Sequence, residues 1–258
     1  MLHLIGVGLS DPDDITVKGL EKAKSADKVY LEGYTSKLNA TQDELEALYE
    51  QSITVAPRRQ LEQDHDDILD EAENKDVAVL VIGDVFSATT HSMLFVEARE
   101  RGIPVDIVHN ASIITAVSQT GLQLYKFGKT TSIVYPDGDW LPATPYEAIR
   151  DNRDKGLHTL CLLDIKADSA GLDGAEDTFM TAQEAVNILY ELERREASNV
   201  ITDDTPLIVV QDLTGPDQKI WTGELGSIEA FDGDQPLHSL ILPADLHDME
   251  QTMLEHVS

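Results

Sequence analysis

Glycine-containing turns follow two apolar runs near the start of the chain. The segment 83–91 reads Gly-Asp-Val-Phe-Ser-Ala-Thr-Thr-His and comes directly after the apolar run 77–82, and Gly-Val-Gly-Leu at 6–9 follows a second run at 2–5. Short apolar runs bounded by turn residues are typical of buried strands. Because ligands of α/β proteins bind at the carboxyl ends of strands, these two strand exits predict a small-molecule site.

Asp84 is the leading side chain at these exits. A carboxylate there can accept hydrogen bonds from a ribose, or lie near a cation such as a sulfonium. The alternative is structural, because Asp is preferred as the N-cap of a helix and a helix is expected to follow. The residue types leave both interpretations open.

The segment 6–9 begins like a dinucleotide-binding fingerprint but lacks the third glycine. The turn after it, 11–14, reads Asp-Pro-Asp-Asp, and its charge would repel a pyrophosphate at a helix N-terminus. We therefore interpret the glycines as a close backbone approach to an uncharged or cationic ligand. A tight turn that requires positive φ is the alternative.

Two further segments have polar or aromatic character at informative places. Ser112 follows the predicted strand 105–108, where it could cap a helix or touch a ligand through its backbone. The segment 121–129 is aromatic and basic within an acidic chain. This local reversal indicates a buried or partner-facing surface, or lysine stems that lie over core aromatic residues.

The sequence contains no motif that indicates a metal site or a catalytic nucleophile. The eight histidines form neither an HExxH motif nor a closely spaced pair, so we expect no metal site. The acidic clusters 11–14 and 64–67 are interpreted as solvated surface. Cys161 lies in an apolar run and is expected in the core. No GxSxG or Walker motif is present.

The charge of the chain is extreme. Acidic residues outnumber basic ones by 48 to 19, which gives a net charge of −29 with 41% hydrophobic residues. Such a chain repels nucleic acid at ordinary salt, which excludes a nucleic-acid partner. At about 1 M salt the Debye length falls to roughly 3 Å and the self-repulsion largely disappears. The composition therefore predicts a halophilic host.

Cell location follows from absent signals. Met1 is followed at once by a strand pattern, so we expect no signal peptide. No apolar run approaches the roughly 20 residues needed to cross a bilayer. The single cysteine excludes an intrachain disulfide. These features predict a soluble cytoplasmic protein with no membrane partner.

The first half of the chain alternates strand and helix patterns, which predicts an α/β fold with a mainly parallel sheet. Capping boxes mark helix starts at Thr41 and Thr181. The predicted strands are 2–5, 28–32, 52–56, 77–82 and 105–108, and the predicted helices are 16–25, one that begins at Thr41, 61–73 and 90–101.

Less regular spacing in the second half predicts a mixed sheet. We place the domains at 1–110 and 111–258 and expect an exposed loop at 168–177. The predicted strands of this half are 131–135, 157–163, 207–210, 220–222 and 237–242, and its predicted helices are 146–153, 182–196 and 244–255.

Motifs along nearly the whole chain occur in a specific order and spacing, and together they resemble the diphthine synthases, methyltransferases that act on elongation factor 2. The segments that carry the resemblance are 4–9, 14–20, 32–36, 88–91, 121–129, 156–160 and 163–167. Where this family commonly has Gly-Asp-Pro, Val85 follows Asp84, and Ser87 stands where a small apolar residue is usual.

The resemblance implies two α/β domains of the tetrapyrrole methylase-like fold. It implies S-adenosyl-L-methionine in the cleft between them, S-adenosyl-L-homocysteine as product, and a homodimer. Carried over by position, the cofactor contacts would be Leu9, Asp84, Ser87, Ser112, Ile113, Leu163, Thr214 and His238. For His238, which precedes the strand 239–242, a histidine held by backbone at a strand start is the alternative.

The implied reaction is methylation of the amino group of 2-(3-amino-3-carboxypropyl)histidine on elongation factor 2, in diphthamide biosynthesis. The residues name no general base, and the catalytic residues are left unassigned. Two alternatives stay open: a methyltransferase of the same fold that acts on a corrin or porphyrin, and a catalytically silent module that binds the translation factor.

Overall fold

The computed structural model describes residues 1–166 and 178–257. The chain forms two compact units: one holds Met1–Ile114 with Ile165, Lys166 and Thr178, and the other holds Thr115–Asp164 and the residues from Phe179 onward. The loop expected at 168–177 lies outside the described residues. No helix in the described ranges has the length and apolar character needed to span a bilayer.

The first unit is built on a five-stranded sheet in the order β3-β2-β4-β1-β5, in which all the recorded pairings are parallel. This confirms the parallel sheet predicted for the first half. The strands are β1 (Leu2–Gly6), β2 (Lys28–Glu32), β3 (Ile53–Ala56), β4 (Val77–Val81) and β5 (Val105–Val108).

The helices of this unit begin where the sequence supplies caps. The Thr16 side chain accepts a hydrogen bond from Gly19 N, and Thr41 and Glu44 form the predicted capping box. Gly102, with φ +74°, follows the last of these helices as expected. The helices are α1 (Val17–Ser25), α2 (Gln42–Tyr49), α3 (Arg58–Glu62), α4 (Asp66–Ala72) and α5 (Ser92–Glu100), with a 3₁₀ turn η1 (Pro12–Asp14).

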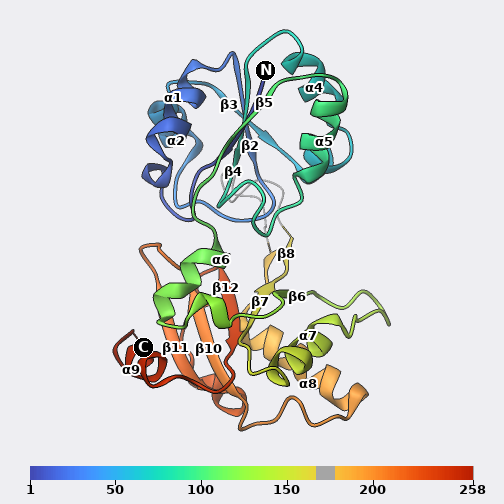
Figure 1. Cartoon of the computed structure of the whole chain (residues 1–258), viewed down its shortest axis with the longest axis vertical. Coiled ribbons are helices and arrows are strands. Elements are labelled where there is room, and N and C mark those ends of the chain that lie inside the picture. Colours follow the sequence, from blue (N-terminus) through green and yellow to red (C-terminus); the bar gives the residue numbers. More distant parts are fainter. Residues whose placement is uncertain (167–177, 258) are drawn as a thin grey trace. The chain divides into compact units, whose positions relative to one another are not determined.

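Both faces of the parallel sheet are buried. Successive side chains of a strand point to opposite faces, and in β4 Val79 packs in one hydrophobic cluster whereas Ala78 and Leu80 pack in the other. Helices α3, α4 and α5 contribute to the first cluster, and α1 and α2 to the second. Figure 1 shows α1 and α2 on one side of the strands and α4 and α5 on the other. This arrangement explains why β4 has an unbroken apolar run rather than an alternating one.

One predicted helix of this unit is wrong in extent. We expected a single helix over 61–73, but the chain forms α3 and α4 with a break between them. Gln63 leaves the helical region at φ −133°, and the Arg59 guanidinium donates to the Asp64 carboxylate over 2.5 Å. The apolar spacing continues across the break, so periodicity alone does not reveal it.

The second unit contains a mixed five-stranded sheet in the order β11-β10-β12-β7-β6, as predicted. Only β6 and β7 pair in parallel among its recorded ladders, and the other neighbours are antiparallel. The strands are β6 (Thr131–Ile133), β7 (Thr159–Leu163), β10 (Pro206–Gln211), β11 (Lys219–Glu224) and β12 (His238–Leu242). A separate two-stranded sheet joins β8 (Ile165–Lys166) to β9 (Thr178–Phe179).

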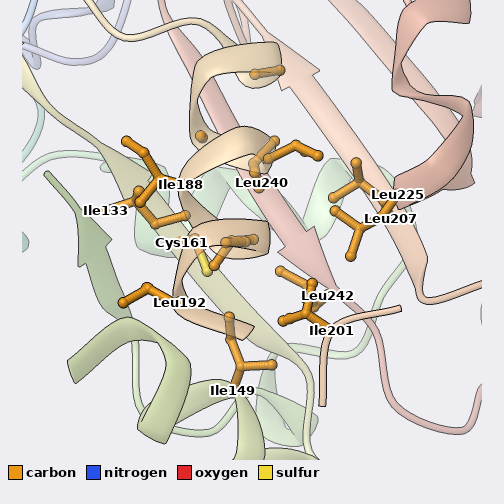
Figure 2. Packing of buried hydrophobic residues seen from close by; sticks show 14 of the residues in the cluster. Ile133, Ile149, Cys161, Ile188, Leu192, Ile201, Leu207, Leu225, Leu240 and Leu242 are labelled. Atoms are coloured by element: carbon orange, nitrogen blue, oxygen red, sulfur yellow. The ribbon is translucent and has the colours of Figure 1, made fainter. Parts of the chain in front are cut away.

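One hydrophobic cluster forms the core of the second unit (Figure 2). Cys161 lies within it, fully buried, between side chains of the sheet and of α8, which confirms its predicted place in the core. The helices are α7 (Thr144–Arg153), α8 (Ala182–Glu196) and α9 (Asp248–Val257), with 3₁₀ turns η2 (Val117–Thr120), η3 (Leu124–Lys126) and η4 (Leu225–Ala230). The short helix α6 (Ile113–Ala116) begins in the first unit and ends in the second.

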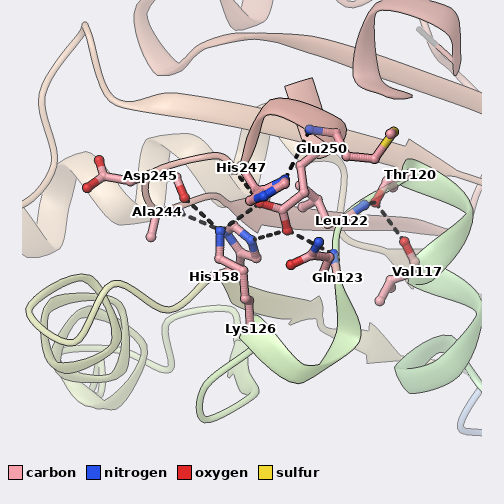
Figure 3. Close-up of polar contacts among 11 residues, drawn as sticks. Val117, Thr120, Leu122, Gln123, Lys126, His158, Ala244, Asp245, His247 and Glu250 are labelled. Atoms are coloured by element: carbon pink, nitrogen blue, oxygen red, sulfur yellow. Dashed lines mark hydrogen bonds and ion pairs between the residues drawn. The ribbon is translucent and has the colours of Figure 1, made fainter. Parts of the chain in front are cut away.

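A buried carboxylate explains one of the two lysines of the segment 121–129, Lys126. Figure 3 shows Lys126 and His158 pointing toward Glu250 of α9. The Glu250 carboxylate is fully buried and accepts from Lys126 Nζ over 2.6 Å and from His158 Nε2 over 3.1 Å. It also accepts from the backbone N–H groups of Gln123 and His247. Lys126 is therefore an internal partner of α9.

This site predicts acid-sensitive stability. Burial raises the pKa of Glu250, but the hydrogen bonds outweigh burial and lower it from 4.5 to about 2. Between these two values the unfolded chain binds more protons than the folded one, so stability falls as pH falls through this window. We expect urea unfolding at pH 7, 4 and 3 to show a loss on the order of 3 kcal/mol at most.

Replacing one partner tests the same ion pair. Lys126→Met leaves the buried Glu250 carboxylate without its cation and should destabilise the fold by about 2–4 kcal/mol. Lys129→Met removes an exposed lysine of the same segment and should change stability by less than about 0.5 kcal/mol. Equal unfolding midpoints for the two variants would show that the Lys126–Glu250 ion pair does not stabilise the fold.

Candidate functional site

The carboxyl ends of β4, β1 and β5 are neighbours in the parallel sheet of the first unit, and the turns after them meet. Gly8 and Gly83 exchange two backbone hydrogen bonds, with N···O distances of 3.2 and 2.7 Å. The Asn110 amide donates to the Gly6 carbonyl over 3.0 Å and to the Asp14 carbonyl over 2.9 Å. These hydrogen bonds to backbone carbonyls thus hold the three turns together at one edge of the sheet.

Two glycines of these turns are required by close approach. A Cβ on Gly6 would lie 2.7 Å from the Gly83 carbonyl oxygen. Gly8 has φ +89°, and a Cβ on it would clash with Asp14 Cβ at 2.3 Å. The tight turn with positive φ, which was the alternative interpretation, is therefore present at Gly8, whereas a close approach of these glycines to a ligand stays a prediction.

Asp84 holds the edge together. Its Oδ1 accepts from Phe86 N over 3.1 Å and from Ser87 Oγ over 2.9 Å. Its Oδ2 accepts from His109 Nδ1 over 2.8 Å and from Asn110 N over 3.1 Å. A carboxylate offers about four acceptor positions, so these four donors occupy its capacity. The carboxylate joins the turn after β4 to the turn after β5.

This geometry corrects one interpretation of Asp84 and explains its charge. The N-cap of α5 is His91, so the alternative in which Asp84 caps the next helix is wrong. Burial raises the pKa of Asp84, but the hydrogen bonds led by that from His109 outweigh burial and hold the pKa below its usual value. Asp84 is therefore ionised at neutral pH.

The first unit gathers the cofactor residues predicted from its half of the chain. A Cβ built on Gly83 would lie 3.9 Å from Leu9 Cδ2 and 3.8 Å from Ser112 Cβ. Ser112 is buried, and Ile113 follows it as the first residue of α6. Because Ser87 is bonded to Asp84, these predicted residues form one cluster at the carboxyl edge.

The second unit gathers the other three predicted residues at one end of its mixed sheet. Leu163 ends β7 and His238 begins β12. The antiparallel register pairs Leu162 with Ser239 and Gln211 with His238, so these strand ends lie side by side. Thr214 follows β10 at this end.

His238 is fixed by the fold through both ring nitrogens. Nδ1 accepts from the backbone N–H of Ala182 over 3.0 Å, and Nε2 lies 3.3 Å from Gln211 Oε1. Burial lowers the pKa of His238, which is neutral at pH 7. The structure thus shows the backbone-held histidine of the alternative interpretation, and a cofactor contact by His238 stays a prediction.

Thr214 adopts a backbone conformation that is uncommon for a β-branched residue. Its φ is +76°, and its N–H donates to Gln218 Oε1 over 2.7 Å. The side chain is exposed. Its contact with a cofactor also stays a prediction.

A second polar cluster in the first unit was not among the predicted site residues. Glu32, the last residue of β2, and His91 are both fully buried, and His91 Nε2 lies 3.3 Å from Glu32 Oε2. Tyr34 Oη lies 3.4 Å from the same nitrogen. A charged residue at the end of an apolar strand and a histidine after a hydroxyl-rich turn were the signals in the sequence.

The burial of this cluster shifts both ionisations toward the neutral forms. Burial raises the pKa of Glu32 to about 7, against the opposing hydrogen bonds of Thr35. Burial lowers the pKa of His91 to about 4. At pH 7 His91 is therefore neutral, and the Glu32 carboxyl is close to the midpoint of its ionisation. Among the described residues, no group of three or more His, Cys, Asp or Glu side chains is placed to hold a metal.

Alanine substitutions test the contact of the turns. Gly8→Ala adds a clash with Asp14 to the cost of positive φ, whereas Gly102→Ala, at φ +74°, meets no atom within 4 Å. We expect Gly102→Ala to cost about 1–2 kcal/mol and Gly8→Ala at least about 2 kcal/mol more, in urea unfolding. Equal losses would contradict the close contact.

Glu32 generates a prediction with the opposite pH sense from Glu250. A pKa raised from 4.5 to about 7 means that the folded state binds more protons in this window, so ionisation costs stability as pH rises. Glu32→Gln should therefore be more stable than the wild type at pH 8, by on the order of 1–3 kcal/mol. The gain should vanish near pH 4.

Glu44→Gln is the matched control for this substitution. Hydrogen bonds from Thr41 lower the pKa of the exposed Glu44 carboxyl, so its replacement should not stabilise the protein at pH 8. Thermal unfolding at pH 4 and pH 8 measures both variants. A Glu32→Gln protein that is less stable than the wild type at pH 8 would show that the carboxylate is needed in its charged form.

Comparisons with known proteins agree over the length of the chain. The family model described as Tetrapyrrole (Corrin/Porphyrin) Methylases matches residues 1–229. A diphthine synthase of Methanocaldococcus jannaschii is 43% identical over 100% of this chain and 98% of its own. A human diphthine methyl ester synthase is 42% identical over 98% of this chain and 94% of its own.

A solved structure gives the same result for the fold. The crystal structure of a diphthine synthase matches with a TM-score of 0.88 and 32% identity, and covers 100% of this chain and 95% of that one. The parallel sheet of the first unit and the mixed sheet of the second are therefore those of this group. The chain belongs to the diphthine synthase family of the tetrapyrrole methylases.

Proposed function

We propose that the chain methylates the amino group of 2-(3-amino-3-carboxypropyl)histidine on elongation factor 2 and so gives diphthine. As a member of its family it is an S-adenosyl-L-methionine-dependent methyltransferase of diphthamide biosynthesis. The observation that carries the proposal is the full-length similarity to diphthine synthases, together with a cluster of the predicted cofactor residues at the carboxyl edge of β1, β4 and β5.

The residues of this edge suit the cofactor. Gly83 offers backbone beside the Leu9 side chain and Ser112, and a Cβ there would have no atom nearer than 3.8 Å. A Cβ at this position would thus make ordinary van der Waals contacts with the groups around it. The ionised Asp84 provides a negative field that favours a sulfonium. We propose Leu9, Asp84, Ser87, Ser112 and Ile113 as contacts from the first unit.

We propose Leu163, Thr214 and His238 as the contacts from the second unit. They share one end of the mixed sheet, and His238 is neutral and fixed in orientation. Fixed groups of this kind orient a ligand without reorganisation at the moment of reaction. The domain limits 1–110 and 111–258, with a cofactor cleft, remain part of the proposal.

Methyl transfer depends more on the position of the substrate nitrogen than on further activation of the methyl group. S-adenosyl-L-methionine supplies a methyl group that is already activated by its sulfonium. The protein must hold the substrate nitrogen in line with that carbon, and orientation of this kind can contribute about 7–11 kcal/mol. The nitrogen must also be unprotonated to attack, which requires a proton acceptor.

Several associated features belong to the same proposal. We infer a homodimer, a cytoplasmic location, a halophilic host and no nucleic-acid or membrane partner. The net charge of −29 supports the halophilic host and the absence of a nucleic-acid partner, because both follow from screening and repulsion. The homodimer rests on the family resemblance alone.

A transfer assay tests the proposed activity. The wild-type protein, assayed in multimolar KCl with methyl-labelled cofactor, should label elongation factor 2 that carries the modified histidine and leave the unmodified factor unlabelled. Labelling of a corrin or porphyrin in place of the protein would contradict the proposed substrate. Calorimetry that shows no binding of S-adenosyl-L-homocysteine would instead indicate a silent binding module.

The site of methylation can be read from the same product. The relatives in Yarrowia lipolytica and human are named diphthine methyl ester synthases, at 45% and 42% identity, beside the archaeal diphthine synthases. A methyl ester is hydrolysed by mild alkali, whereas a methylated amine is not. We expect all label to survive alkali, and release of a part of it would show additional esterification.

A further inference from the structure

His109 is held by a buried carboxylate yet exposed to solvent. It is the first residue after β5, and its Nδ1 lies 2.8 Å from Asp84 Oδ2. The His109 side chain is 68% exposed, whereas that of Asp84 is 7% exposed. The ring is therefore anchored on one side and open on the other.

The partner of Nδ1 decides the tautomer of this ring. An ionised carboxylate only accepts hydrogen bonds, and Asp84 is ionised, so the proton of a neutral His109 lies on Nδ1. This leaves the lone pair of Nε2 as the acceptor. A carboxylate that orients an imidazole in this way is the arrangement by which enzymes present a histidine base.

Among the described residues, which include all eight histidines, only His109 combines these properties. In the first unit His3, His65 and His91 are buried. The remaining histidines, His158, His238, His247 and His256, belong to the second unit, where two are buried and two lie next to or within α9. His109 alone is exposed at the carboxyl edge of the parallel sheet, where the predicted cofactor residues of the first unit gather.

We propose that His109 Nε2 is the general base that removes a proton from the substrate amine before methyl transfer. This role rests on the proposed function. Asp84 then has two roles. It joins the turns after β4 and β5, and it is a positioning residue because it sets the tautomer and the orientation of the ring. His109 is thus the proton acceptor that the reaction requires, for which the residue patterns named no candidate.

The proton balance is simple. One N–H bond of the substrate ammonium breaks and its proton forms a bond with Nε2, which gives an imidazolium stabilised by Asp84. The freed nitrogen lone pair forms the N–C bond, and the electron pair of the broken S–C bond stays on sulfur. Because His109 is exposed, it returns its proton to water and can serve again for the next methylation.

A measurement without cofactor tests the tautomer. Two-dimensional ¹H–¹⁵N correlation spectra of the free protein, assigned with the His109→Asn variant, should show His109 protonated at Nδ1 and unprotonated at Nε2 above its pKa. In an Asp84→Asn protein this preference should weaken. A His109 ring protonated at Nε2 in the wild type would overturn the proposal.

The kinetic test uses a substitution that keeps the structural contact. The side-chain amide of His109→Asn can still donate to Asp84 but cannot accept a proton. We expect unchanged affinity for S-adenosyl-L-homocysteine, an unchanged melting temperature and a fall in kcat of about 100-fold or more. The loss should shrink as pH rises toward the pKa of the substrate amine, because more free amine is then present.

The matched control is His256→Asn, an exposed histidine of α9, which should retain wild-type kcat. An active wild type with an equally active His109→Asn protein would overturn the role of His109 and leave the proposed function standing. Loss of cofactor binding in His109→Asn would likewise overturn it, in favour of a purely structural contact. An inactive wild type would overturn the proposed function, and the role of His109 with it.

Discussion

The carboxylate of Asp84 is the interaction on which the functional edge depends. Neighbouring parallel strands end at the same edge of a sheet, so the turns that follow them come into contact. Their buried polar groups must then find hydrogen-bond partners. Four donors from two separate turns converge on this one side chain. Because the contacts run from the turn after β4 to the turn after β5, they fix Ser87, His109 and Asn110 relative to one another.

Burial and hydrogen bonding act against each other at the buried carboxyls, and their balance decides the charge of each one. Asp84 and Glu250 each accept four hydrogen bonds, and the pKa of each is lowered. At Glu32, burial outweighs the hydrogen bonds from Thr35 and Tyr34, and the pKa rises to about 7. A buried charge persists only where enough dipoles or opposite charges replace water.

The acidic composition and the functional edge have different physical causes. A net charge of −29 concerns solubility and self-repulsion in a given solvent, not the fold. The edge is made by local features: glycines that permit close backbone contact, a satisfied Asp84 and an oriented, exposed His109. This separation explains how an unusually acidic chain keeps 43% identity to a relative over its whole length.

The sequence by itself determined the α/β class, a parallel and a mixed sheet, the two capping boxes, the core place of Cys161 and the strand exits at Gly8 and Gly83. These follow from local rules of periodicity, capping and turn chemistry. Only the tertiary structure decided the break after Glu62, the union of Lys126 with Glu250, and the bond between Asp84 and His109. The two partners of each pair lie 25 and 124 positions apart along the chain, and only the packing of strands, turns and helix α9 brings them together.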